Sequence, residues 1–185
     1  MGANSLMRLD LSHNKITQIN EYAFRGLIQL TKLQLSHNFL ETINKDVFLE
    51  NPYIESISLD NNQLQYIEAE VFNQLRRIRE VNLSHNRLQQ LSPLSFEAAY
   101  GLENLFLSSN NLSEFYLANK SISGQLNLDH NNLTSFTVNN TKFVRADHNR
   151  ITNIEMVNAV YLENVELSHN NLSDIRNITN LSALL

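Results

Sequence analysis

The sequence predicts an α/β-type repeat solenoid, in which a parallel β-sheet lines the concave face and the convex side is mostly irregular. Two observations lead to this prediction. The 185 residues include 30 Leu and 28 Asn, and these two types recur in a fixed order. The segment LMRLDLSHNKI at residues 6–16 has the form LxxLxLxxNxL, and this form occurs eight times along the chain.

The repeated asparagine sets the register of the repeats. Successive asparagines are separated by 24 residues four times and then by 21, 18 and 21 residues. We expect leader residues at 1–5 and a single array over 6–185, with 24-residue repeats to about residue 120 and shorter repeats after it. A ninth repeat opens at Leu181 and Leu184. The repeated asparagines are Asn14, Asn38, Asn62, Asn86, Asn110, Asn131, Asn149 and Asn170.

Each repeat begins with two apolar residues spaced two apart, such as Leu9 and Leu11. In an extended strand both side chains point to the same face, which is the core face. No repeat can bury this face alone, so neighbouring repeats must cover one another. Strands are therefore expected at about 6–13, 30–37, 54–61, 78–85, 102–109, 124–130, 142–148 and 162–169.

Two further positions have a structural interpretation. The amide of the repeated asparagine can satisfy backbone groups where the chain turns inside the core, so replacing Asn86 should destabilise the protein while replacing exposed Asn61 should not. The four phenylalanines at 24-residue spacing should stack as an aromatic spine under the convex side. They are missing from the later repeats, so a change of bend is expected near residues 110–120. The spine residues are Phe24, Phe48, Phe72 and Phe96.

Composition excludes several classes of function. The chain has a net charge of -5 and no cluster of Lys and Arg, so nucleic acid is not an expected partner. It has no Cys and only 4 Gly, so no thiol chemistry, disulfide or phosphate-binding glycine motif is expected, and no cofactor. No apolar run approaches the ~18 residues that a bilayer crossing needs.

Every histidine occupies the position directly before the repeated asparagine. Such regularity is a property of the repeat, and it predicts a ladder of imidazoles along one edge of the sheet. No metal site and no enzyme activity are expected. A metal held by three consecutive imidazoles, with Asp129 and Asp147 nearby, and a pH-sensitive edge are the alternative hypotheses. The six are His13, His37, His85, His130, His148 and His169.

Glycosylation sequons point to an extracellular protein. Three of them, at Asn111, Asn132 and Asn171, can arise by chance from the repeat pattern, but the other five cannot. We expect secretion, with a cell-surface ectodomain as the alternative and a cytosolic scaffold as a weaker one. No apolar signal segment follows Met1, and the chain is interpreted as a segment of a longer protein. The eight sequons are at Asn82, Asn111, Asn119, Asn132, Asn139, Asn171, Asn177 and Asn180.

The repeat motif identifies the chain as similar to extracellular leucine-rich repeat proteins of insects, whose fold is a horseshoe. The four 24-residue repeats resemble Toll-type receptor ectodomains. The shorter repeats, such as FVRADHNRITNI at 143–154 and VELSHNNLSDI at 165–175, look most like the mosquito leucine-rich immune molecules. This resemblance implies a haemolymph protein that stabilises complement-like thioester proteins. It maps no binding residue, and it leaves the oligomeric state open.

Outward positions of the strands form the candidate binding surface, because a curved sheet presents them together. Most of these residues are polar. Phe106 lies between two core positions, Phe143 also points outward, and Arg145 follows it by two residues. Aromatic and arginine side chains are typical of interface centres, so these three are the candidate contact patch. The predicted function is recognition of a protein partner in innate immunity, and a receptor or adhesion ectodomain is the alternative.

Overall fold

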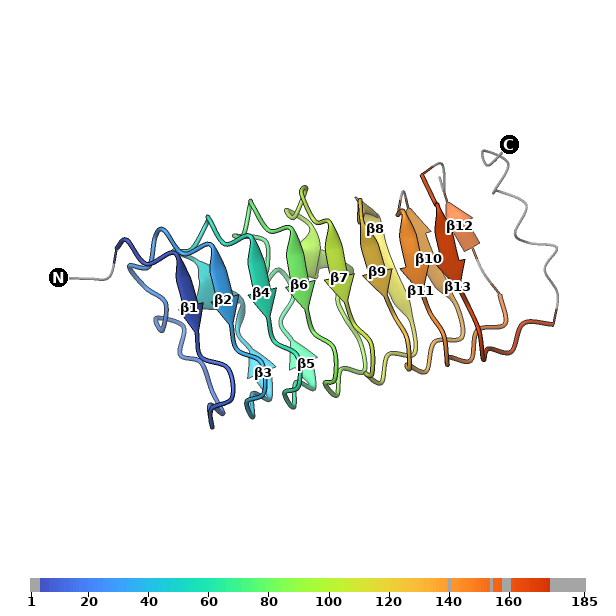
Figure 1. Ribbon diagram of the computed structural model, residues 1–185, viewed down its shortest axis with the longest axis horizontal. Helices are drawn as coiled ribbons and strands as arrows, with labels where there is room; N and C mark the ends of the chain where they lie inside the picture. The colour runs from blue at the N-terminus through green and yellow to red at the C-terminus, as the bar shows by residue number, and fades with distance from the viewer. Residues whose placement is uncertain (1–3, 140, 154, 158–160, 174–185) are drawn as a thin grey trace.

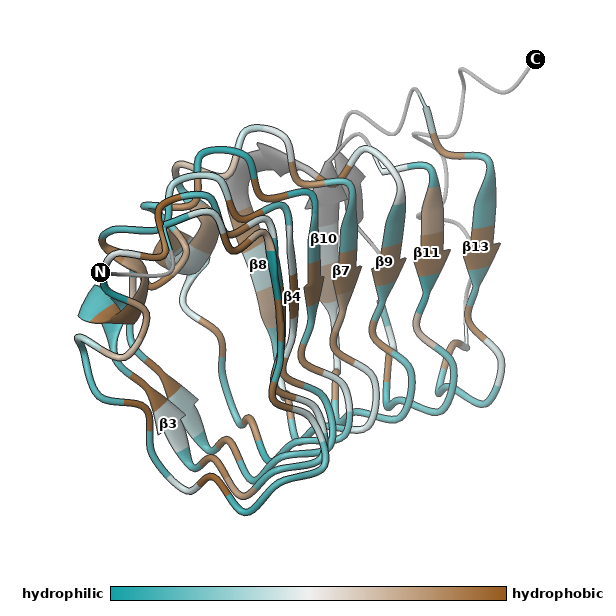
Figure 2. Cartoon of the chain, turned by 60° about the vertical axis from the view of Figure 1, so that its left-hand side comes forward, coloured by the Kyte–Doolittle hydropathy of each residue, from teal (hydrophilic) through white to brown (hydrophobic). Residues whose placement is uncertain are grey.

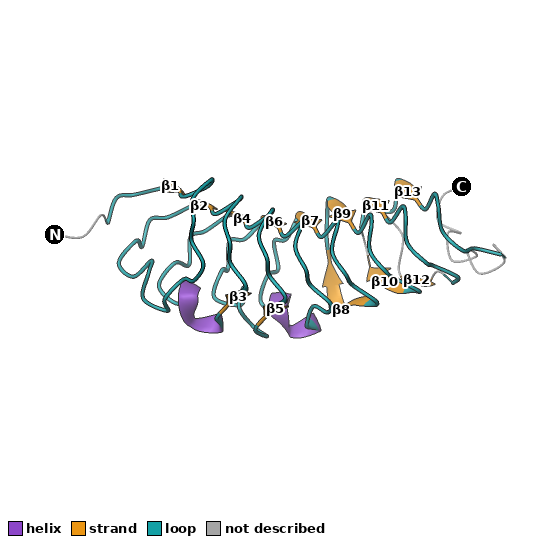
Figure 3. Ribbon diagram, turned by 90° about the horizontal axis from the view of Figure 1, so that it is seen from below, coloured by secondary structure: helices purple, strands orange, loops and turns teal. Residues whose placement is uncertain are grey.

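The computed structural model describes residues 4–139, 141–153, 155–157 and 161–173. The chain winds into coils, and each coil adds one short strand to a parallel sheet (Figure 1). This row of strands lines the inner side of a shallow arc (Figure 3). The predicted parallel-sheet solenoid is confirmed. In sheet order the strands are β1 (Arg8–Asp10), β2 (Lys32–Gln34), β4 (Ser56–Ser58), β6 (Glu80–Asn82), β7 (Asn104–Phe106), β9 (Gln125–Asn127), β11 (Phe143–Arg145) and β13 (Asn164–Glu166).

These strands lie where they were predicted but are shorter. The first was expected over 6–13, and it covers Arg8–Asp10. The cause is the turn that follows, where His13 adopts a left-handed backbone conformation with φ 56°. Hydrogen bonds between coils continue past the strand, since the Leu11 N–H donates to the Gln34 carbonyl oxygen at 2.8 Å. The ladder is therefore longer than the strand.

The core lies between the concave sheet and the return segments of the coils. In the second coil Leu33, Leu35 and Leu40 are fully buried, which matches the predicted inward positions. Leu9 and Leu11 in the first coil are only partly buried. Figure 2 shows the hydrophobic strand centres above the hydrophilic turns that follow them. Burial of the paired apolar positions by neighbouring coils thus follows the sequence pattern.

The aromatic spine forms as predicted. Phe24, Phe48, Phe72 and Phe96 are all buried. Their rings stack in sequence, with centroids 6.1, 6.3 and 4.9 Å apart and interplanar angles of 8°, 17° and 14°. Offset stacking of this kind adds to the free energy gained by burying the rings. The spine fills the space behind the sheet in the first four repeats.

The return segments of the 24-residue repeats contain only short secondary-structure elements. Two 3₁₀ helices, η1 (Lys45–Phe48) and η2 (Pro93–Phe96), each contribute one spine phenylalanine. Their N-caps are Asn44 and Ser92, whose side chains accept hydrogen bonds from the N–H groups of Asp46 and Leu94. A two-stranded parallel pair, β3 (Thr42–Ile43) and β5 (Tyr66–Ile67), lies below them. The remainder of this side is irregular.

The shorter repeats build a second parallel sheet, which the sequence analysis did not predict. Its strands are β8 (Phe115–Ser121), β10 (Phe136–Asn139) and β12 (Glu155–Val157), in the order β12-β10-β8. Phe115 and Phe136 are paired in register and both are buried. An extended strand covers more distance per residue than a 3₁₀ turn, so it suits a coil with fewer residues.

Gly124 marks the place where the first shorter coil packs against a long one. A Cβ atom at this position would lie 2.7 Å from Asn104 Oδ1 and 2.8 Å from the Glu103 carbonyl oxygen. Only glycine fits such a close approach of two backbones.

No helix in the described part of the chain is long and apolar enough to span a membrane.

Candidate functional site

The outward residues of the concave sheet stand in two rows across all eight strands. Strand register places Asp10, Phe106 and Arg145 in one row, with Asn82 and Asn127 on either side of Phe106. The row two residues earlier on each strand contains Phe143, flanked by Gln125 and Asn164. The complete first row is Asp10, Gln34, Ser58, Asn82, Phe106, Asn127, Arg145 and Glu166.

The structure brings two of the three candidate contact residues close together. Phe143 and Arg145 lie two residues apart on β11 and point to the same face. Phe143 is 40% exposed. Phe106 is half-buried and lies on β7, with β9 between it and β11. The patch is therefore centred on β11, and Phe106 is at its border.

Arg145 is held by carboxylates from both neighbouring coils. Its Nε lies 3.2 Å from Asp129 Oδ2 and 3.1 Å from Glu166 Oε2. The Asp129 side chain is only 10% exposed, and its Oδ1 accepts a hydrogen bond from the Asp147 N–H at 2.8 Å. Asp147 Oδ1 in turn accepts from the Ser168 N–H. These contacts hold the guanidinium group in place while the Arg145 side chain stays 44% exposed.

The acidic groups that hold Arg145 were not predicted from the sequence. Asp129 and Asp147 entered only as possible companions of the histidine ladder, because they precede His130 and His148. The available signal was an Asp two residues after the strand in two consecutive coils, Asp129 and Asp147, with Arg145 at the end of the second strand. A similar contact occurs in the first coil, where the Ser12 N–H donates to Asp10 and lowers the pKa of that carboxyl group.

The histidines form stacked groups along the edge of the sheet. His130, His148 and His169 stack at centroid distances of 4.4 and 4.2 Å, and His13 stacks on His37 at 4.2 Å. All six adopt the left-handed conformation, near φ 55°. The stacked rings are nearly parallel, with interplanar angles of 8° to 11°. The described residues contain no group of three or more His, Asp or Glu that could hold a metal ion.

The repeated asparagines bond to backbone groups of two coils. Nδ2 of Asn86 donates to the carbonyl oxygens of Leu59 and Leu83, both at 3.0 Å, and Oδ1 accepts from the Leu64 N–H at 3.0 Å. The other repeated asparagines from Asn38 to Asn149 also donate through Nδ2 to carbonyl oxygens of their own coil and of the preceding coil. In each case Oδ1 accepts from a backbone N–H of the preceding coil, and all of these side chains are buried. Asn170 makes the same bonds while partly exposed. Among the described residues, Asn14 donates only to the Leu11 and Ser12 carbonyl oxygens of its own coil. The asparagines with bonds to a neighbouring coil are Asn38, Asn62, Asn86, Asn110, Asn131, Asn149 and Asn170.

The sequons lie on different faces. Asn82 belongs to β6 on the concave sheet, where it is partly buried and its Oδ1 accepts from the Ser84 N–H. Asn111, Asn132 and Asn171 lie in the turns after the repeated asparagine, and Asn111 and Asn171 are exposed. Asn119 and Asn139 belong to β8 and β10 of the second sheet, although their side chains are not described. Asn177 and Asn180 lie outside the described residues.

The sequons are expected to be glycosylated unequally. When the protein is secreted from insect cells, Asn119, Asn139 and Asn177 are expected to carry glycans more fully than Asn82, whose amide is engaged and faces the concave side. Site-resolved mass spectrometry measures the occupancy of each sequon. Occupancy of Asn82 alone would contradict the assignment of faces.

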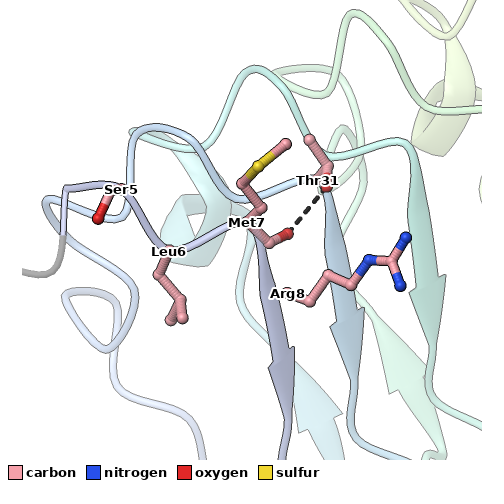
Figure 4. Close-up of a pocket in the computed structure, with 5 residues that line it drawn as sticks. All are labelled: Ser5, Leu6, Met7, Arg8 and Thr31. Carbon is pink, nitrogen blue, oxygen red and sulfur yellow. Dashed lines mark hydrogen bonds between the residues drawn. The ribbon is translucent and has the colours of Figure 1, made fainter.

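A shallow pocket lies beside β1 (Figure 4). Ser5, Leu6, Met7, Arg8 and Thr31 line it. The Thr31 hydroxyl donates to the Met7 carbonyl oxygen at 2.8 Å, so the polar groups at its centre satisfy each other. Arg8 is its only charged residue, and nothing in it resembles a catalytic arrangement.

The coils, the asparagine ladder and the open concave sheet together define a solenoid repeat protein. The family described as leucine rich repeat matches residues 4–64, 28–88 and 52–112, and this chain belongs to that family. No curated protein sequence matches the chain significantly.

Several solved structures share the fold. The leucine-rich repeat domain of APL1B is 26% identical with a TM-score of 0.82, over 90% of this chain and 51% of that one. A chain of the LRIM1/APL1C complex is also 26% identical with a TM-score of 0.82, over 91% of this chain and 32% of that chain. The Toll–Spatzle complex of Drosophila is 26% identical with a TM-score of 0.78, over 92% of this chain and 25% of that one. This chain thus spans about half of the first structure and less of the others.

Proposed function

We propose that the chain is a non-enzymatic recognition or scaffold segment of a secreted innate-immunity protein, and that its concave face binds another protein such as a complement-like factor. The observation that supports this proposal most directly is the β11 patch, where exposed Phe143 lies beside an Arg145 held in place by Asp129 and Glu166. Interface centres favour aromatic and arginine side chains whose position is fixed before binding.

Support for an immune setting comes from the comparisons. APL1B, the LRIM1/APL1C complex and the Toll–Spatzle complex are similar over nine tenths of this chain. The last two are complexes, so related leucine-rich repeat chains engage other proteins. The sequons support secretion. A protein partner is favoured over nucleic acid because the concave rows mix both signs of charge and lack a basic stripe.

A Toll-like or adhesion ectodomain is the second candidate, favoured by the similarity to the Toll–Spatzle complex. The complete coding sequence distinguishes the two. A cysteine with a coiled coil after the repeats favours the secreted protein, whereas an apolar segment of ~20 residues favours the receptor.

The contact patch can be tested by substitution. Phe106→Ser, Phe143→Ser and Arg145→Ala together are expected to weaken binding to a purified complement-like thioester protein about tenfold, or ~1.4 kcal/mol. Surface plasmon resonance measures the affinity. The control pair Phe39→Ser and Arg76→Ala alters exposed residues away from the concave sheet and should leave binding unchanged.

Removing Arg145 also leaves the nearly buried Asp129 carboxylate without its partner, which lowers stability for a reason unrelated to binding. Adding Asp129→Asn removes that charge and should restore the melting temperature to within about 3 °C of the native protein. Native affinity in this stable variant would show that the rings and the arginine only cover the sheet.

A further inference from the structure

A pocket of about 610 Å³ opens on the flank of the solenoid, away from the concave rows. We call it the junction pocket. Its floor is the fourth coil, and its walls come from the third and fifth coils. The residues that matter for its chemistry are Tyr66, Gln90, Leu91, Ser92, Glu114 and Tyr116.

The pocket exists because the outer layer is interrupted at the fourth coil. The third coil has β5 at this level and the fifth coil has β8, but residues 89–92 form no strand. Residues 89–91, which the structure describes together with both neighbouring coils, make no backbone hydrogen bond to either of them. Pro93 then starts η2. Leu91 is consequently only partly buried, whereas the equivalent Ile67 and Phe115 are buried. The junction between long and short repeats thus leaves a gap that neighbouring coils do not fill.

The walls of the junction pocket suit a cation. Tyr66 and Tyr116 are 48% and 49% exposed, and Glu114 is the only charged residue in the lining. The face of a tyrosine ring attracts ammonium and guanidinium groups, and a carboxylate beside it adds direct Coulomb attraction. The lining contains no Lys or Arg, so it offers no positively charged side chain to an anionic ligand.

Other tyrosines of the same molecule show how such a ring is used here. The guanidinium carbon of Arg77 lies 4.6 Å from the ring centroid of Tyr53, and that of Arg25 lies 5.8 Å from Tyr22. Within the described residues, neither Tyr66 nor Tyr116 has a cation of this chain over its ring. Two exposed rings and a carboxylate therefore converge without an internal cation.

We propose that the junction pocket binds an arginine or lysine side chain presented by an extended segment of a partner protein. The tyrosine rings contact the cation and its alkyl stem, Glu114 pairs with its charge, and the unpaired peptide groups of residues 89–91 bond to the partner backbone. This site is separate from the β11 patch, so a partner could engage both surfaces or only one of them.

The experiment is a titration of the isotope-labelled full chain with the peptide acetyl-Gly-Arg-Gly-amide, followed by NMR. Signals of residues 66, 90–92 and 114–116 are expected to shift. Glu114→Gln and Tyr116→Leu, both at exposed positions, should each weaken binding about three- to fivefold. Glu97→Gln, an exposed carboxylate outside the pocket, is the matched control and should not change the affinity.

The neutral peptide acetyl-Gly-citrulline-Gly-amide has nearly the same shape without the charge, and it should bind at least about threefold more weakly. Equal binding of the two peptides would overturn the proposal, as would native affinity in Glu114→Gln. Shifts of the same signals with methyl glucoside but not with the arginine peptide would instead identify a saccharide site and also overturn it. None of these outcomes depends on the concave face, so failure here leaves the proposed function untouched.

Discussion

Replacing Phe72 with alanine is expected to lower the free energy of unfolding by about 3–5 kcal/mol. The ring is fully buried, and it stacks between Phe48 at 6.3 Å and Phe96 at 4.9 Å. Its removal leaves a cavity in the middle of the spine and interrupts two ring contacts. Urea unfolding followed by circular dichroism measures the change.

Two controls separate the spine from a general effect of losing a ring. Phe39 is 46% exposed and does not stack with any ring of the spine. Phe39→Ala should therefore lower the free energy of unfolding by less than about 1 kcal/mol. Phe72→Leu keeps most of the buried volume and should cost less than Phe72→Ala. Equal losses for Phe72→Ala and Phe39→Ala would show that the spine does not hold the long repeats together.

Asn86→Ala is expected to cost about 1–3 kcal/mol, because it leaves buried backbone groups of two coils without partners. The Leu59 carbonyl and the Leu64 N–H belong to the third coil, and the Leu83 carbonyl belongs to the fourth. Asn86 is 8% exposed, so water cannot replace these bonds easily. Thermal and urea unfolding both report the loss.

The control for this substitution differs from the one that the sequence suggested. Asn61 was expected to be an exposed position where alanine is neutral. That expectation is wrong, since Asn61 is partly buried, donates to Asp60 Oδ2 and has φ 55°, a conformation that alanine adopts at a cost of about 1–2 kcal/mol. Asn111, which is exposed and follows a repeated asparagine, is the better control. Equal melting shifts for Asn86→Ala and Asn111→Ala would contradict the ladder.

The sequence predicted the features that repeat. An apolar pair such as Leu33 and Leu35 recurs in every coil, and a phenylalanine recurs at 24-residue spacing in the first four repeats. The strand positions, the core face and the phenylalanine spine therefore followed directly. It did not predict the second sheet of β8, β10 and β12. Those return segments have no common motif, and their strands form only because neighbouring coils are short enough to place Phe115 opposite Phe136.

The candidate binding sites were predicted less completely, for the same reason. Alternation along a strand is enough to assign Phe143 and Arg145 to the outward face. The ion pairs of Arg145 and the junction pocket depend on which residues adjacent coils bring together across 16 to 24 positions of sequence. Such contacts can be predicted only when the alignment of each coil with its neighbours is known.

The spacing of the coils has a consequence for how the chain folds. Every strand pair closes a loop of nearly constant length, from 24 residues between β1 and β2 to 18 between β9 and β11. Loop-closure entropy changes so slowly with length that these extremes differ by only about 0.3 kcal/mol. No coil therefore has a strong entropic advantage as a starting point. Folding can begin at any adjacent pair and spread in both directions, with local packing deciding which pair forms first.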